Sequence, residues 1–206
     1  WLCDQGCHVI SLSLGSPYKS ERIVNAVNAA DNAGVIVICA SGNDGQSNGV
    51  DYPAAESKCL IGCAIDSKHD LASFSDRGPQ VKQRGVSGAG VRVYGCTSRG
   101  YTLMSGTSMA TPSIAGQLAL AIDAEIEFLG EQVTYGYQGA LDLISKYKLD
   151  LGKKGNDSGY GIGAFDIYSY VKHLHEKQDD SPPTKPDPQW ETIHTFDKYR
   201  IQQRGK

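Results

Sequence analysis

The stretch that decides the fold is HVISLSLGSPYKSERIVNAVNAADNAGVIVICASGN, residues 8–43. Its first part, residues 8–16, is rich in Val, Ile and Leu and ends in a glycine-containing turn, which predicts a short strand. Its last part, residues 35–43, begins as a near-continuous apolar run, as expected of a strand covered on both faces. Strand, helix and strand in this order predict a right-handed β-α-β unit and an α/β fold with a mostly parallel sheet.

The middle of this stretch predicts the crossover helix. Ile23, Val27 and Ala30 fall on one helical face. Ser20 stands where a helix cap is expected, and Gly34 stands where a glycine can end the helix. The helix is therefore expected to cover the sheet with that apolar face.

The remaining elements follow from the same patterns. Strands are expected at residues 59–66, 71–76 and 91–96, and helices at residues 108–123 and 137–148. Residues 158–175 are expected to form a glycine turn that leads into a last helix. From residue 176 the chain becomes charged and carries four of its eight prolines. This composition predicts a domain over residues 1–175 and an extended linker and tail over residues 176–206.

The overall composition limits the classes of binding partner that are expected. The 206 residues are 40% hydrophobic, enough for a real core, and carry a net charge of −3. That balance gives no reason to expect a nucleic acid or an anionic membrane as partner, and no apolar run approaches the roughly 18 residues of a membrane span. The oligomeric state is left open. The chain begins without an initiator methionine, and it is expected to be part of a longer protein.

The cysteines do not indicate a metal or redox motif. There is no C-x-x-C pair among Cys3, Cys7, Cys39, Cys59, Cys63 and Cys96. Cys39 and Cys63 lie in apolar strand-like runs, which favours buried free thiols. Disulfides remain an alternative that the sequence does not decide.

A candidate nucleophile stands in GTSMATPSIAG, residues 106–116. Ser108 is placed at the start of a long apolar helix, where unpaired amides and the helix dipole favour developing negative charge. Pro112 suits a first helical turn, where its missing N–H costs little. An isolated Gly-Thr-Ser would indicate only a helix cap, so the interpretation needs a second feature.

Asn43 supplies that second feature. It stands just past the carboxyl end of the predicted buried strand, at the sheet edge where ligands bind in open α/β folds. An amide there could donate to an oxyanion. Asn-Asp-Gly is also strong turn chemistry, so Asn43 alone would indicate a turn.

Together these motifs resemble a known family. Residues 9–16, 34–45, 52–79 and 106–116, in that order, closely resemble the subtilisin-like serine peptidases, or subtilases. The resemblance is detailed over residues 8–122 and looser to the glycine turn at 159–166. It departs at Ala89 and Ser113, where the family often has Pro and His. It implies a three-layer fold with a mostly parallel sheet between helices, and a C-terminal portion of the catalytic domain.

The resemblance also implies roles. Ser108 matches the nucleophile, and Asn43 matches the side-chain donor of the oxyanion hole beside the backbone N–H of Ser108. Two substrate walls match segments against which an extended substrate adds as a strand. They are Ser13, Leu14 and Gly15 on one side and Ala40, Ser41 and Gly42 on the other.

The substrate walls carry no charge and little bulk. They are therefore expected to accept Phe, Leu or Tyr before the scissile bond. Asp44 follows the oxyanion asparagine and is expected at the rim, where its carboxylate would tolerate Lys or Arg. The alternative is that Asp44 only shapes the turn.

A base for Ser108 is not found among the five histidines. Subtilisins order their triad as Asp, His, Ser, and the match begins after the segments that should carry Asp and His. His8 precedes a strand, His69 lies in a turn, His173 and His175 point in different directions on a helix, and His194 follows the linker. The catalytic Asp and His are therefore expected upstream of this chain.

The sequence favours a serine endopeptidase acting on polypeptides, and by resemblance alone a secreted one. The alternative is a subtilase-fold module that has lost its catalytic acid–base pair. An unrelated serine hydrolase is disfavoured because no G-x-S-x-G elbow is present. No cofactor is required for the chemistry. Acidic loops such as residues 31–34, 42–45 and 49–53 could bind structural calcium, but their spacing does not fit an EF-hand, and the sequence favours solvated turns.

Overall fold

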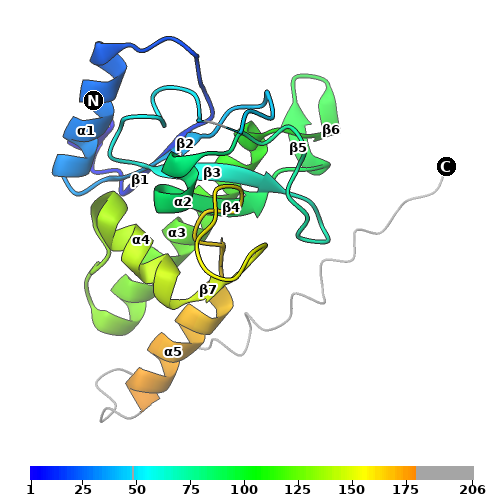
Figure 1. Ribbon diagram of the computed structural model, residues 1–206. Coiled ribbons are helices and arrows are strands. Elements are labelled where there is room, and N and C mark those ends of the chain that lie inside the picture. The colour runs from blue at the N-terminus through cyan, green and yellow to red at the C-terminus, as the bar shows by residue number, and fades with distance from the viewer. Residues whose placement is uncertain (48, 180–206) are drawn as a thin grey trace.

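The computed structural model describes residues 1–47 and 49–179 as three layers with a central sheet (Figure 1). The strands of this sheet are β1 (Val9–Leu12), β2 (Ile36–Ala40), β3 (Leu60–Ile65), β4 (Gly85–Ala89), β7 (Lys148–Leu149) and β8 (Ala164–Phe165). Their order is β1-β2-β3-β4-β8-β7, and every neighbouring pair is parallel except β7 with β8. The expected α/β fold with a mostly parallel sheet is confirmed.

Helices cover both faces of the sheet. They are α1 (Glu21–Asn32), α2 (Pro79–Arg84), α3 (Thr107–Leu129), α4 (Gly136–Lys146) and α5 (Ile167–Asp179), with a 3₁₀ turn at Cys3–Gln5. Alternate residues of β2 divide the core: Ile36 and Ile38 pack with α3, α4 and α5, whereas Val37 and Cys39 pack with α1 and α2. Successive side chains of a strand point to opposite faces of the sheet, so this division of the core places a layer of helices on each face.

The β-α-β unit forms as expected. β1 and β2 are parallel neighbours, with Leu12 opposite Cys39. Ser20 is the N-cap of α1, although its hydroxyl makes no capping bond, and Gly34 has a φ of 83° just after the helix end. Val27 and Ala30 lie on the buried face of α1 as expected, but Ile23 is exposed and Val24 is the third buried residue.

Residues 71–76 are not a strand. Leu71 makes only an isolated bridge to Ile65, and Ser75 N–H closes a turn onto the carbonyl of Ala72. Ser75 and Asp76 are fully buried, and their side chains bond to the loop after β2 and to Ala64 of β3. Their side-chain hydrogen bonds hold this segment in a loop, which is the competition that short polar residues offer to regular structure.

Two other expectations concern the thiols and the domain boundary. All six cysteines are free, and Cys39 and Cys63 are buried, as expected. Helix α5 continues through Asp179, past residue 175, where the composition placed the end of the domain. The tail beyond residue 179 lies outside the described residues.

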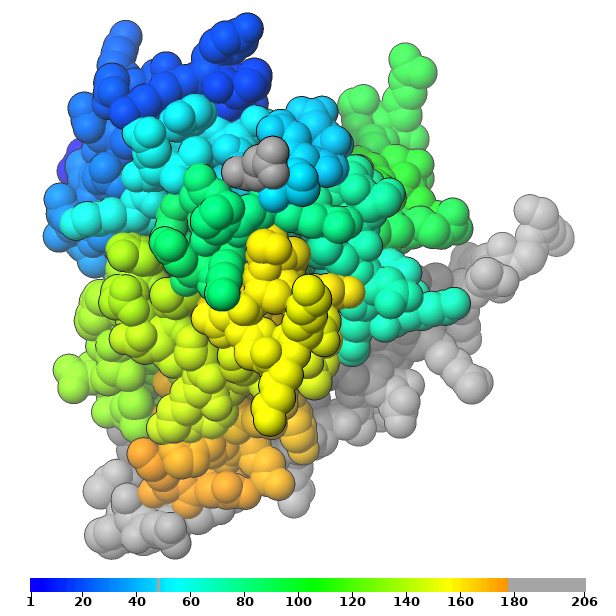
Figure 2. Space-filling model, viewed as in Figure 1, coloured from blue at the N-terminus to red at the C-terminus, as the bar shows by residue number. Residues whose placement is uncertain are grey.

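One part of the chain projects from the body. Strands β5 (Val93–Thr97) and β6 (Gly100–Met104) form an antiparallel hairpin, which stands out at the upper right of Figure 2. Its exposed face carries Tyr94 and Tyr101, whose rings stack with centroids 5.5 Å apart. Among the described helices, none combines the length and apolar character needed to cross a bilayer.

Candidate active site

The candidate site is built at the start of α3. Gly106 is the N-cap of this helix, and its N–H donates to the carbonyl of Gly90 at 2.8 Å, which ties the helix start to the end of β4. Ser108 is the second helical residue and is half-buried. An N–H at this position has no acceptor within the helix, so the Ser108 amide is available to a ligand.

Asn43 lies against the same helix start. Its Oδ1 accepts hydrogen bonds from Thr107 N–H at 2.8 Å and from Thr107 Oγ1 at 3.1 Å. Because a backbone N–H can only donate, the amide oxygen must face Thr107. Among the described residues, none accepts a hydrogen bond from Asn43 Nδ2, which leaves that donor free for a ligand.

Ser13 contacts Ser108 directly. Ser13 Oγ donates to the carbonyl of Ser108 at 2.8 Å, and Ser108 Oγ lies 3.5 Å from the carbonyl of Ser13. Pro112 explains why that carbonyl needs a donor, since residue 112 would supply the helical N–H and proline has none. Pro112 is the sixth residue of α3, so the expected place in the first turn is wrong by a turn.

The substrate walls (residues 13–15 and 40–42) leave the carboxyl ends of β1 and β2. Because these strands are parallel neighbours, the walls come side by side, at the sheet edge where ligands bind. They do not present equal surfaces. Leu14 is 48% exposed, whereas Ser41 is fully buried, with its hydroxyl 3.5 Å from Ser75 Oγ.

The turn after Asn43 is held by a residue that the sequence did not single out. Asp76 Oδ1 accepts from the N–H groups of Asp44 and Gln46, at 3.1 and 2.8 Å. The Asp44 side chain is exposed. Burial raises the pKa of the Asp76 carboxyl above its usual range, against the lowering effect of those two hydrogen bonds. The buried carboxyl group of Asp76 therefore holds the Asn-Asp-Gly turn in place.

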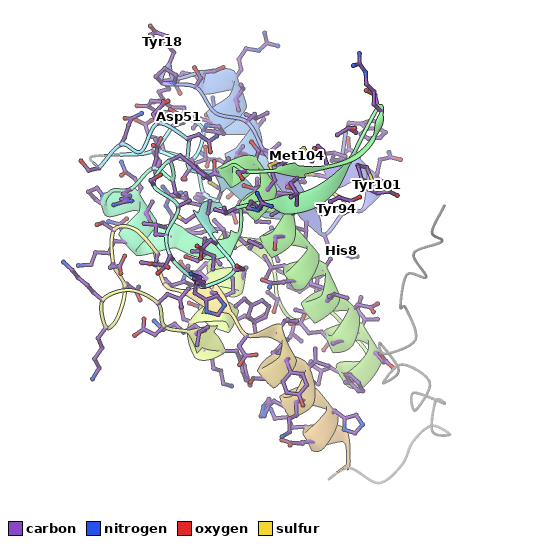
Figure 3. All side chains as sticks on the ribbon, turned by 90° about the vertical axis from the view of Figure 1, so that its right-hand side faces the viewer. His8, Tyr18, Asp51, Tyr94, Tyr101 and Met104 are labelled. Carbon is purple, nitrogen blue, oxygen red and sulfur yellow. The ribbon has the colours of Figure 1, made fainter. Side chains whose placement is uncertain are left out.

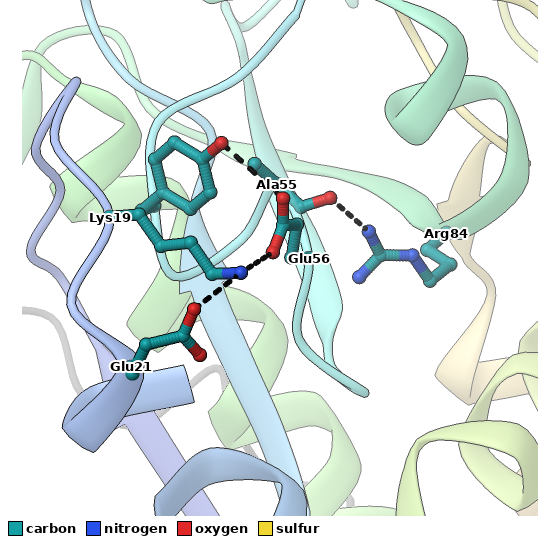
Figure 4. A network of polar contacts seen from close by, with 6 residues as sticks. Lys19, Glu21, Ala55, Glu56 and Arg84 are labelled. Atoms are coloured by element: carbon teal, nitrogen blue, oxygen red, sulfur yellow. Dashed lines mark hydrogen bonds and ion pairs between the residues drawn. The ribbon is translucent and has the colours of Figure 1, made fainter. Parts of the chain in front are cut away.

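A polar network joins the two loops that flank the site (Figure 4). Lys19 pairs with both Glu21 and Glu56, and the hydroxyl of Tyr52 donates to Glu56 at 3.4 Å. The same loops exchange backbone bonds between Ser16 and Tyr52, at 3.0 and 2.9 Å. These contacts fix the segment around Tyr52 beside the first substrate wall.

No described histidine contacts Ser108. His173 packs against Tyr147, His175 packs against Phe128, and His69 lies in a turn with a φ of 67°. His8 precedes β1, about 16 Å of extended chain before Ser13, and Figure 3 shows it well away from Asp51. His194 lies outside the described residues.

The described residues also show no cluster of three or more His, Cys, Asp or Glu side chains that could hold a metal ion. The sequence-based idea of a calcium loop remains a prediction.

Comparisons with known proteins show the family and the fold of the chain. A family model described as the subtilase family, peptidase S8, matches residues 1–163. The thermostable alkaline protease of Halalkalibacterium halodurans is 39% identical over 134 residues, which are 65% of this chain and 36% of that protein. Subtilisin DY of Bacillus licheniformis is 39% identical over 126 residues, 59% of this chain and 45% of that protein. The chain thus spans less than half the length of these relatives.

Solved structures show the same fold. The prenylagaramide maturation protease PagA has a TM-score of 0.72 and 25% identity, over 84% of this chain and 64% of that one. The patellamide maturation protease PatA has a TM-score of 0.73 and 24% identity, over 85% of this chain and 65% of that one. The sheet and its covering helices are therefore those of a subtilisin-like protease domain.

Proposed function

The chain belongs to the subtilase family, and from that premise we propose that it supplies the nucleophile and the oxyanion hole of a serine endopeptidase. Ser108 Oγ attacks the carbonyl carbon of a peptide bond. The oxygen that becomes negative is held by the backbone N–H of Ser108 and by Asn43 Nδ2. The positive end of the α3 dipole adds to this stabilisation.

The observation that carries the proposal is the pinned amide of Asn43. Thr107 holds its Oδ1 with two donors, so the Nδ2 donor is oriented before any substrate arrives. A donor that needs no reorganisation when charge develops is what makes an oxyanion hole effective. A turn-forming asparagine would have no need of this restraint at the start of a helix.

The base must come from elsewhere. A serine hydroxyl is a weak nucleophile until a base accepts its proton, and no described residue is placed to do so. We infer that a histidine, oriented by an aspartate, is supplied by a segment N-terminal to residue 1. The exposed edge of β1 supports this, because it leaves a place for further strands beside Ser13.

The substrate is proposed to be a polypeptide. An extended chain can add beside the substrate walls, which offer backbone groups and small side chains. A location outside the cell follows from the family resemblance alone and belongs to the same proposal.

The competing proposal is a subtilase-fold module without catalysis. It has no need of a free amide donor beside a serine at a helix start, so the pairing of Asn43 with Ser108 favours the enzyme. The two proposals differ in one measurable property, the reactivity of the Ser108 hydroxyl.

The test uses the natural protein expressed from its whole reading frame. A fluorophosphonate reagent should label Ser108, peptides should be hydrolysed, and Ser108→Ala should abolish both. Asn43→Ala should lower kcat by about 10²–10³-fold with little change in KM, the loss known for one oxyanion donor in a subtilisin. Absence of labelling in the folded protein would establish the module without catalysis. The 206-residue chain alone should not turn over peptides, since none of its described residues is placed to act as the base.

A further inference from the structure

Asp51 places a carboxylate against both substrate walls. A Cβ atom added to Gly15 would lie 2.9 Å from Asp51 Oδ2, and one added to Gly42 would lie 3.3 Å from Asp51 Cγ. Glycine at both positions thus leaves room for this side chain. Figure 3 shows Asp51 on the same side of the molecule as Tyr18.

The Asp51 carboxylate has no partner among the described residues. Its backbone N–H donates to the carbonyl of Ser41 at 2.9 Å, but no described side chain or amide donates to its oxygens. The cation of the neighbouring loop, Lys19, is taken by Glu21 and Glu56. Burial, with a smaller effect of Asp44, raises the pKa of Asp51. A half-buried carboxylate without a partner is stabilised when a cation arrives.

Asp76 adds a second, independent feature on the same side. It is fully buried, and its Oδ2 is buried without a hydrogen-bond partner, although its Oδ1 accepts two backbone bonds. A Cβ atom added to Gly42 would meet this Oδ2 at 2.0 Å, so the unpartnered oxygen lies directly behind the wall glycine. Two carboxyl groups therefore lie next to the Gly42 position, and neither pairs with a cation in the part of the chain that the structure describes.

We propose that Asp51 makes this site select Arg or Lys as the residue before the scissile bond. The inference rests on the proposed endopeptidase function. The uncharged walls take the alkyl stem of the long basic side chain, and its charged head meets Asp51 at the inner end. The walls alone predicted a preference for large apolar residues, and the carboxylate between them replaces that preference.

The first arm of the test measures specificity. The natural protein from its whole reading frame is given peptides that differ only in the residue before the scissile bond. Lysine and norleucine form the matched pair, since they share the stem and differ in charge. The kcat/KM ratio should favour lysine by about 10–100-fold, the range expected of a hydrogen bond to a charged group.

Two matched variants locate the charge. Asp51→Asn keeps the size of the side chain and should bring the lysine-to-norleucine ratio close to one. Asp44→Asn removes an equal charge at the exposed rim and should keep most of the preference, because exposed charges are screened. A ratio that survives Asp51→Asn, or one that only Asp44→Asn removes, overturns the proposal.

The second arm does not depend on catalysis. Binding of benzamidine and of its neutral isostere benzamide is measured on the Ser108→Ala protein. Benzamidine should bind at least tenfold more tightly, and Asp51→Asn should abolish the difference. Equal binding of the two overturns the proposal even if peptides are cleaved. If binding depends on charge but the protein that retains Ser108 cleaves no peptide, the cation site is supported and the endopeptidase function is rejected.

Discussion

Ser13 and Pro112 both act on one atom, the carbonyl oxygen of Ser108. Proline withholds the helical N–H, and the hydroxyl of Ser13 replaces it at 2.8 Å. Removing the Ser13 hydroxyl leaves the Ser108 carbonyl without its protein donor and loosens the backbone of the proposed nucleophile. We expect Ser13→Ala to lower kcat about fivefold, corresponding to about 1 kcal/mol for a lost hydrogen bond, with KM nearly unchanged.

A double-mutant cycle separates this positioning from a general loss of stability. In a Pro112→Ala background, the N–H of residue 112 can bond to the Ser108 carbonyl, so adding Ser13→Ala should cost little. Steady-state kinetics and thermal unfolding of the four proteins give the coupling. An equal loss of kcat in both backgrounds would show that Ser13 does not act through this carbonyl.

Asp51 also predicts a pH dependence of stability. Its folded pKa is raised above 3.8, and the groups that interact with it are the acidic Asp44 and Asp76. A raised pKa means that stability is fully present below the unfolded value and is lost as pH rises through the folded pKa. Asp51→Asn should therefore raise Tm at pH 7, by an amount that shrinks as the pH falls toward 3.8.

The measurement is thermal unfolding of both proteins between pH 4 and pH 7. Asp66→Asn is the contrasting control, because hydrogen bonds from the N–H groups of Asp70 and Lys68 lower the pKa of Asp66. Its substitution should destabilise the protein at pH 7. A Tm difference for Asp51→Asn that does not change with pH would show that the carboxylate is not under electrostatic strain.

At the scale of elements, α3 is joined to α5 and to the loop before α4 by one buried carboxylate. Glu125 is fully buried and accepts hydrogen bonds from Val133 N–H, from the N–H and hydroxyl of Thr134, and from Tyr170. Burial and Glu125 together raise the pKa of the Tyr170 phenol. Four donors on one group make it the point at which three segments of the C-terminal half meet.

Removing one donor should therefore cost measurable stability. Tyr170→Phe is expected to lower the free energy of unfolding by about 1.5–3 kcal/mol, the range for a hydrogen bond to a charged group. That corresponds to a Tm lower by several degrees for a chain of this size. Tyr168→Phe is the matched control on the same helix, since Tyr168 is 72% exposed and should be neutral. Equal effects of the two substitutions would contradict this account.

Strands could be predicted from the sequence only where their side chains form an apolar run. β2 is apolar throughout and was expected, whereas β4, with the sequence GVSGA, was missed. A Cβ added to Gly88 would lie 2.9 Å from the carbonyl of Ala110, and one added to Gly62 would lie 2.7 Å from Thr111 Oγ1. The glycines of β3 and β4 admit the close approach of α3, so tertiary packing replaces strand propensity there.

At the scale of the whole molecule, the candidate site also has residues that could be predicted from the sequence and residues that could not. Ser108 and Asn43 could be chosen from the sequence because each lies in a motif, and the motifs occur in the order found in the subtilases. Asp51 could not, because its place depends on the backbone bridge between Ser16 and Tyr52, two loops that no local pattern connects. The buried Asp76 was hidden for a similar reason, since residues 71–76 resemble a strand in their spacing and form a loop.

The last prediction concerns the edge of the sheet at β1. Among the described strands, β1 pairs with β2 alone, and a hollow lies on either face beside it. One is about 610 Å³, lined by residues that include Leu2, Ile10, Leu12, Ile23 and Val27, and the other is about 340 Å³, lined by residues that include His8, Val9, Ala119 and Ile122. An unpaired edge flanked by apolar surface is where further strands and helices can pack.

If a segment N-terminal to residue 1 covers this edge, hydrogen exchange will show it. In the 206-residue chain alone, amides of β1 should exchange much faster than those of β3, which has a strand on each side. In the protein from its whole reading frame, β1 should become nearly as protected as β3, and Tm should rise. The β3 amides serve as the internal reference, because their neighbours are the same in both proteins. Protection of β1 that equals that of β3 in the 206-residue chain would mean that this edge needs no covering segment, and the inferred source of the catalytic base would lose its structural support.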